Sequence, residues 1–367
     1  MNMRFFSLKN IITFMGILLG LSSCIKEEAP NAEADILSCE VEGNLLIREP
    51  VISNHEVKLY ANSWNDLSAI APRFTLTQGA TIVPESGTIR DFSSPQTYTV
   101  TSEDRQWKKT YTVKFITSDI ATEYHFEHIR FHEYGGRQYF HIFYDHTVDG
   151  EEMTWGSGNT GFLITNSTAP AEDYPTCQSK NGYQGKCAKL TTRSTGFLGK
   201  MFKAPLAAGN LFTGTFEINM ANMAKSTRFG TPFRKTPLAL TGYYKYIAGE
   251  TLTDKNSQKV PDQKDECDIY AVLYEVTHEV PYLDGTNIKT HPNIVMIAQL
   301  PQGKQTEQWK RFSLPFSVVE GRKIEPAKLQ AGKYNLAIVM TSSKGGAQFL
   351  GAVGSTLYVD EMQLFYQ

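Results

Sequence analysis

The strongest constraint on the fold is a run of alternating residues at 238–246. A period of two is the period of a β-strand that turns one face to a core. Tyr244 and Tyr246 share the parity of the leucines in this run, so we expect them in the core. Tyr243 and Lys245 have the opposite parity, so we expect them on the outer face. The run lies at the end of a longer stretch, 200–246, that we interpret as two strands joined by a loop rich in Pro and Gly.

Composition favours strands in the rest of the chain as well. Aromatic residues make up 12% of the 367 residues, with 18 Tyr and 21 Phe, and aromatic rings fit a pleated surface. We find no helical pattern of convincing length and predict an all-β protein. After position 118, strands are expected at 139–144, 187–192, 211–218, 238–246, 267–276, 294–299, 310–316, 333–342 and 356–366.

The first 23 residues read as a lipoprotein signal peptide. Arg4 and Lys9 precede an apolar run, 11–21, that is too short to span a membrane. The sequence LSSC at 21–24 resembles a bacterial lipobox, which implies cleavage before Cys24, acylation of its thiol and attachment to the outer membrane. The following Lys-Glu-Glu at 26–28 resembles the surface-export signal of Bacteroides lipoproteins, which implies a location facing the cell exterior. An ordinary secretory signal is the alternative.

A polar tether, residues 24–34, leads into two predicted domains. Short strands and turns over 35–117 predict a small β-sandwich. This segment resembles the immunoglobulin-like domains that follow the lipid anchor in many Bacteroides surface proteins, and the resemblance implies a spacer. It rests on the blocks PESGT at 84–88, DFSSP at 91–95, YTVTSED at 98–104 and YTV at 111–113.

Residues 118–367 form the second predicted domain. Nine to eleven antiparallel strands in a domain of this size favour a two-sheet jelly roll over a closed barrel. The segment resembles the putative carbohydrate metabolism domain family of Bacteroides surface lipoproteins, whose jelly roll is similar to carbohydrate-binding modules. The blocks that carry this resemblance are 155–162 (WGSGNTGF), 185–192 (GKCAKLTT), 208–214 (AGNLFTG), 229–233 (FGTPF), 240–246 (LTGYYKY), 342–346 (SSKGG) and 354–361 (GSTLYVDE).

The similarity to carbohydrate-binding modules implies one metal site. Several such modules hold a structural Ca²⁺ with a Phe-Glu on the first strand and an Asp on the last. Here Phe126-Glu127 opens the domain and Asp360 lies in its final strand, and carboxylate oxygens suit Ca²⁺. In the alternative interpretation, Glu127 and Asp360 face water or cap a bulge.

Exposed aromatic rings are the candidate ligand-binding groups, because their faces stack on the C–H face of a sugar ring. The candidates are Trp155, Tyr243 and Trp309, with Lys245 as a polar neighbour. Trp155 stands beside a Gly-Ser-Gly-Asn loop that could project it. For each ring the alternative is packing in the core. The net charge of −2 argues against nucleic acid as the main partner, and the sequence identifies no protein partner.

Four cysteines remain besides Cys24. Cys177 and Cys187 bracket a polar loop in an exported chain, which predicts a local disulfide. Cys39 and Cys267 share the parity of apolar neighbours in their strands, so we expect them to be buried.

Catalytic signals are weak. Glycoside hydrolysis needs two carboxyl groups about 5–10 Å apart, and local sequence singles out no pair among the acids at 127–152. Asp145-His146, with His141 upstream, suggests acid–base chemistry or merely solvated loop charges. The spacing of His125, His128 and His132 suits a metal only if that segment is helical. We therefore favour a non-catalytic surface lipoprotein that binds glycan. A glycoside-active enzyme and a structural or adhesin-like component stay open as alternatives.

Overall fold

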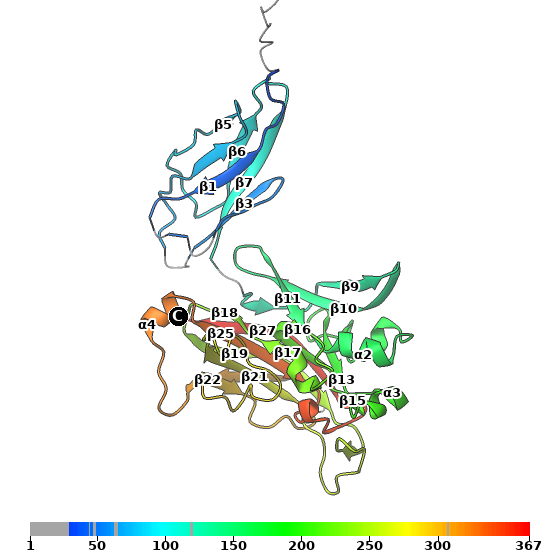
Figure 1. The fold of residues 1–367 in the computed structure, drawn as a ribbon. Helices are drawn as coiled ribbons and strands as arrows, with labels where there is room; N and C mark the ends of the chain where they lie inside the picture. The colour runs from blue at the N-terminus through cyan, green and yellow to red at the C-terminus, as the bar shows by residue number, and fades with distance from the viewer. Residues whose placement is uncertain (1–28, 44, 47–48, 62–64, 118–119, 307) are drawn as a thin grey trace, which may run out of the picture. The chain divides into compact units, whose positions relative to one another are not determined.

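The structure, a computed structural model, describes residues 29–367 except 44, 47–48, 62–64, 118–119 and 307. Residues 1–28, with the predicted signal peptide, Cys24 and the export signal, lie outside the described part. The chain forms two compact units (Figure 1), one from residues up to 44, 49–59 and 67–114, and one from 45–48, 60–66 and 115–367. Among the described residues, no helix is long and apolar enough to cross a membrane.

The first unit is the small β-sandwich that the sequence predicts. Its apolar interior includes Val57, Leu59, Tyr98, Val100 and Val113, which alternate with exposed or half-buried neighbours along three strands. One sheet pairs β1 (Ile36–Glu40) with β4 (Arg73–Leu76). The other has the order β2 (Val51–Ile52), β3 (Glu56–Tyr60), β7 (Lys108–Ile116), β6 (Gln96–Thr101) and β5 (Thr81–Val83).

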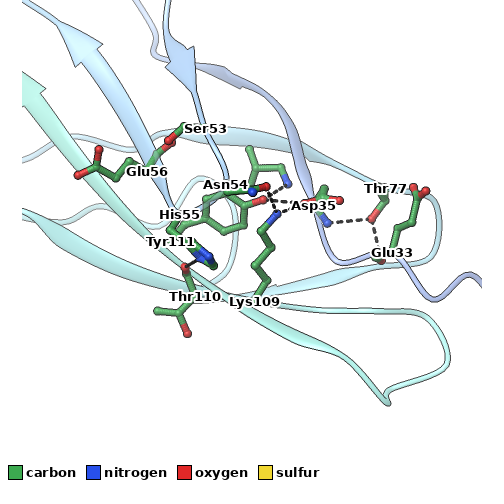
Figure 2. A network of polar contacts seen from close by, with 11 residues as sticks. Glu33, Asp35, Ser53, Asn54, His55, Glu56, Thr77, Lys109, Thr110 and Tyr111 are labelled. Atoms are coloured by element: carbon green, nitrogen blue, oxygen red, sulfur yellow. Dashed lines mark hydrogen bonds and ion pairs between the residues drawn. The ribbon is translucent and has the colours of Figure 1, made fainter. Parts of the chain in front are cut away.

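A polar network fixes the point where the chain enters this sandwich (Figure 2). The carboxylate of Asp35 accepts hydrogen bonds from the ammonium of Lys109 at 2.5 Å and from the hydroxyl of Tyr111 at 2.9 Å. These bonds lower the pKa of Asp35. Its backbone N–H donates to Thr77, whose hydroxyl donates to the carbonyl of Glu33. The network therefore ties residues 33–35 to strands far along the sequence.

The second unit is a two-sheet jelly-roll sandwich, and all nine predicted strands are present in it. One sheet has the order β24 (Ser317–Val318), β22 (Ile294–Gln299), β21 (Asp268–Glu275), β25 (Tyr334–Thr341), β16 (Asn210–Phe216), β11 (Glu152–Gly156), β10 (Arg137–His146) and β9 (Ile129–Tyr134), with β17 (Thr227–Phe229) beside β16 and β18 (Thr231–Pro232) beside β25. The other has the order β12 (Thr176–Ser179), β13 (Cys187–Thr191), β27 (Thr356–Tyr366), β19 (Pro237–Ile247) and β23 (Lys310–Pro315), with β8 (Glu123–Tyr124) beside β27.

The remaining elements are short. Pro326 begins α4. The first N–H groups of a helix have no partner within the helix, so the N–H that proline lacks is not needed there. The helices are α2 (Asn159–Thr165), α3 (Gly196–Met201), α4 (Pro326–Gln330), η1 (Ala171–Asp173), η2 (Met223–Ser226) and η3 (Gly346–Gln348), and the small strand pairs are β14 (Arg193–Ser194) with β15 (Leu206–Ala207) and β20 (Leu252–Thr253) with β26 (Gly351–Ala352).

Strand β19 confirms the parity argument at its centre. Leu240, Tyr244 and Tyr246 are buried in the core between the sheets, and Tyr243 and Lys245 are half-buried on the other face. Leu238 is the exception, because its side chain is 45% exposed. The register of β19 against β27 shifts between Pro237 and Ala239, so the alternation begins only after this irregularity.

Gly242 is the close-packing point of β19 and gives the first prediction. A Cβ there would lie 2.7 Å from the side chain of Met362 and 2.8 Å from the ring of Phe312. We expect Gly242→Ala to overpack the core and lower the free energy of unfolding by about 1–3 kcal/mol. Urea denaturation measures this change. Ser313→Ala, an exposed change on β23, is the control, and equal stability of the two variants would contradict the packing argument.

Candidate functional site

The loop between β12 and β13 carries the first part of the site. Strand pairing ends at Ser179 and Cys187, and the intervening loop is held by two acids from distant parts of the chain. A carboxylate oxygen of Glu127 accepts from the backbone N–H of Lys186 at 2.7 Å. A carboxylate oxygen of Asp360 accepts from the N–H of Gln184 at 2.9 Å. The loop is thereby fixed against the outer face of the six-stranded sheet.

Two glycines allow these acids to approach the loop. A Cβ on Gly182 would lie 2.8 Å from a carboxylate oxygen of Asp360, and a Cβ on Gly185 would lie 2.1 Å from one of Glu127. Gly185 also has a φ of +63°, which side-chain-bearing residues rarely adopt. The absence of a side chain at Gly182 and Gly185 therefore lets Asp360 and Glu127 reach the backbone of the loop.

The loop places Tyr183 on a cluster of rings, which we call the aromatic face and define as Tyr183, Tyr243, Trp309 and Tyr358. The rings of Tyr183 and Tyr243 stack with centroids 3.7 Å apart and planes 9° apart. Trp309 stands edge-on to Tyr183 at 6.2 Å and to Tyr358 at 6.4 Å. A hydrogen bond between the two stacked tyrosines raises the pKa of Tyr183. Tyr183 is 49% exposed, and the other three rings are half-buried.

Strand register explains why these side chains meet. Lys245 of β19 lies opposite Tyr358 of β27, and Tyr243 lies opposite Asp360. The structure thus brings three predicted ligand-binding residues, Tyr243, Lys245 and Trp309, to one region of the outer face. Tyr183 and Tyr358 were missed. Tyr183 lies in a loop whose destination is set by tertiary contacts, and its only local signal is a ring flanked by Gly182 and Gly185.

The prediction that Trp155 is a ligand-binding ring is wrong. Its side chain is only 3% exposed, and its indole N–H donates to Asp145 at 2.7 Å. The ring packs against Tyr124 and Phe126 in the core. A ring enclosed in this way has no face free for a ligand, so Trp155 is not part of the candidate site.

The predicted disulfide between Cys177 and Cys187 is also wrong, because both thiols are free and buried. The register pairs Cys177 with Lys189 and Cys187 with Ser179, so the cysteines are diagonal neighbours. Diagonal positions are about 7–8 Å apart, beyond the usual Cα separation of about 4.4–6.8 Å in a disulfide. Each thiol instead contacts a backbone carbonyl, that of Glu172 or Asn181.

The predicted calcium ligands, Glu127 and Asp360, both hold the loop between β12 and β13. β8 pairs with β27, and Glu127 and Asp360 both bind the same loop. Their oxygens are directed at backbone N–H groups of Lys186, Gln184 and Glu361. No group of three or more metal-ligating side chains occurs among the described residues. The residues present therefore explain the loop without a metal, and the calcium site stays a prediction.

The weak catalytic candidates have structural partners. Asp145 is buried, burial raises its pKa, and it accepts the hydrogen bond of Trp155. His141 accepts a hydrogen bond from the backbone N–H of Gln178, and burial lowers its pKa. The segment with His128 and His132 is not helical: His128 stacks on Tyr144 and His132 on Phe140.

Comparison with known families identifies the chain. Residues 125–365 match the model of the putative carbohydrate metabolism domain, and residues 36–114 match the N-terminal domain of surface glycan-binding proteins (SGBP). Because the first match spans well over half of the sequence, the chain belongs to the putative carbohydrate metabolism domain family. This confirms the resemblance seen in the sequence blocks.

The solved structures that are similar to the chain include two putative glycoside hydrolases. A putative glycoside hydrolase from Bacteroides thetaiotaomicron VPI-5482 is 50% identical, with 93% of this chain and 99% of that chain covered and a TM-score of 0.66. A putative glycoside hydrolase from Bacteroides vulgatus ATCC 8482 is 40% identical, with 68% of this chain and 100% of that chain covered and a TM-score of 0.64. No curated protein matches the sequence.

The buried carboxyl group of Asp360 gives the second prediction. Burial raises its pKa from 3.8 to about 6. Folding therefore favours the protonated form, and the stability contributed by this group is present below pH 3.8 and lost as the pH rises through 6. The shift corresponds to roughly 3 kcal/mol at most.

Asp360→Asn carries no ionisable group at this position. We expect its free energy of unfolding, relative to the native protein, to rise between pH 4 and pH 7. Urea denaturation at several pH values measures this difference. A difference independent of pH would contradict the raised pKa. Glu172→Gln, at an exposed position, is the control.

Proposed function

We propose that the protein is a surface-exposed lipoprotein that binds glycan through the aromatic face. The observation that carries the proposal is the half-exposed Tyr183, held on Tyr243 by a loop that two buried or half-buried carboxylates anchor. A ring fixed in this way loses little conformational entropy when it binds a ligand. The matches to a carbohydrate metabolism domain and to a surface glycan-binding protein domain support the same ligand class.

The chemistry of the face suits a sugar. The free side of the Tyr183 ring offers a π surface to the C–H groups of a pyranose, and Trp309 stands nearly perpendicular to it, at 71°. Tyrosine hydroxyls both donate and accept hydrogen bonds, and the ammonium of Lys245 donates them. Stacking with a few polar contacts at a rim is the general pattern of small-ligand sites.

The proposed location rests on the N-terminal signals and on the family match of the first unit. The lipobox ending at Cys24 would attach the chain to the outer membrane, and the Lys-Glu-Glu at 26–28 would direct it outward. The first unit matches the N-terminal domain of surface glycan-binding proteins and would hold the second domain away from the membrane as a spacer.

Glycoside hydrolysis is the second candidate function, because two similar structures, 50% and 40% identical to this chain, are putative glycoside hydrolases. A hydrolase needs two carboxyl groups that flank the scissile bond. The acids that anchor the loop of the aromatic face, Glu127 and Asp360, each use one carboxylate oxygen to accept a backbone N–H of that loop. We therefore favour binding without turnover, and reducing-end release from a glycan panel would overturn that preference.

Glycan binding is the third prediction. We expect the mature chain to be retarded in native affinity gels by at least one polysaccharide from a broad panel, and to bind its oligosaccharides in calorimetry. Removing one stacking ring, by Tyr183→Ala or Trp309→Ala, should weaken binding about fivefold or more, because such a contact is worth roughly 1 kcal/mol or more.

Tyr134→Ala is the matched control for these variants, since Tyr134 is an exposed ring on β9, in the other sheet. Its affinity should equal that of the native chain. Unchanged affinity in both aromatic-face variants would show that the glycan binds elsewhere, and no retention on any polysaccharide would contradict glycan binding.

Calcium binding is the fourth prediction. If Glu127 and Asp360 hold Ca²⁺, its removal with EDTA should lower the melting temperature, and added Ca²⁺ should restore it. Glu127→Gln should abolish this response, whereas Glu133→Gln, at an exposed acid on β9, should retain it. A melting temperature independent of Ca²⁺ in the native chain would leave the two acids with the loop-anchoring role alone.

A further inference from the structure

A second site lies on the ten-stranded sheet, away from the aromatic face. A cavity of about 330 Å³ is bounded by the sheet, the helices α2, α3, η2 and η3, and residues 285–290. Its floor is formed by the buried side chains of Phe212, Phe229, Tyr270 and Val339. These residues have the strand parity opposite to that of the central core, so the cavity lies on the outer face of the sheet. Its volume is at the lower end of the range for small-molecule pockets.

The rim of this cavity is also apolar. Ile164 of α2, Phe202 at the end of α3, and Met220 line the cavity and are exposed to solvent. Phe202 is 55% exposed. Large apolar side chains gathered around a cavity mouth are typical of a binding site rather than of a free surface.

Several polar side chains of the lining form hydrogen bonds within the protein. The hydroxyls of Thr165, Thr195, Thr227 and Thr341 donate to the carbonyls of Phe162, Ala204, Ala224 and Ser343, respectively. The amide oxygen of Asn210 accepts from the N–H of Gly158 at 2.7 Å. A sugar placed here would bury hydroxyls without partners, which is costly. The cavity therefore suits an apolar ligand.

The charged side chains that line the cavity are basic. Lys289 and Lys344 line the cavity, whereas no acidic residue of the described chain does. The ammonium of Lys289 is paired with Asp268 behind it and lies 4.3 Å from the ring centre of Tyr270. Lys344 is half-exposed, and its partner Glu266, 3.7 Å away, is outside the lining. A ligand with an apolar body and one anionic group matches this arrangement.

We propose that this cavity binds a small amphipathic anion, with its acyl chain on the aromatic floor and its carboxylate toward Lys344. The proposal is independent of glycan binding, because the two sites share no residue. Phe202 and the other exposed rim side chains contact the acyl chain and so lose their contact with water, which favours binding.

Calorimetry of the mature chain with octanoate, and with 1-octanol as the uncharged analogue, tests the site. We expect saturable binding of both compounds. Phe202→Ser should weaken octanoate binding at least fivefold. Phe197→Ser is the matched control, because Phe197 is on the same helix and is 78% exposed but does not line the cavity. Lys344→Gln should weaken octanoate binding and leave octanol binding unchanged.

Three results would overturn the proposal. These are the absence of saturable octanoate binding, equal effects of Phe202→Ser and Phe197→Ser, which would indicate adsorption to the surface, and equal effects of Lys344→Gln on octanoate and octanol. Circular dichroism and the melting temperature of each variant establish that it is folded. Glycan affinity of Phe202→Ser should equal that of the native chain, which separates this site from the aromatic face.

Discussion

The pairing of β27 with its neighbours is the interaction on which the rest of the second domain depends. β27 is the last strand, and it hydrogen-bonds to β13 and β19 and, near its end, to β8, the first strand of the domain. Leu357, Val359, Met362 and Leu364 point into the core, whereas Tyr358 and Asp360 belong to the outer face. Glu361 has a φ of +48°, and the register against β19 shifts at this point. This irregularity explains how Asp360 and Met362 serve opposite faces on either side of it.

On the outer face of the six-stranded sheet, the buried carboxyl group of Asp360 helps to position the ring of Tyr183. Asp360 bears a raised pKa because it is enclosed by the loop that it holds. Its hydrogen bond to Gln184 fixes the residue next to Tyr183. Burial of a carboxyl group is unfavourable by itself, and the hydrogen bonds from backbone N–H groups offset part of that cost. The hydrogen bonds of Asp360 thus help to hold the loop that places Tyr183 on Tyr243.

The two sheets present different chemistry on their outer surfaces. On the six-stranded sheet, the half-exposed Tyr183 stacks on Tyr243 and stands edge-on to Trp309, and Lys245 lies opposite Tyr358. On the ten-stranded sheet, four of the threonine hydroxyls around the cavity donate to backbone carbonyls. Hydroxyls bonded in this way offer little to a polar ligand. The two proposed sites therefore lie on different sheets of the sandwich and share no residue.

The sequence by itself determined the all-β class, the family, the nine main strands and the inward parity of Tyr244 and Tyr246, because strand alternation and family blocks are local properties. It also placed Tyr243, Lys245 and Trp309 among the candidates. Only the tertiary structure decided that Trp155 is enclosed, that Cys177 and Cys187 are offset by two residues across a hairpin, and that Tyr183 completes the aromatic face. Each of these facts depends on register or on a contact between segments far apart in the chain, such as Glu127 with Lys186 and Asp360 with Gln184. A period-two pattern fixes which face a side chain takes, and the pairing of distant strands fixes what it meets there.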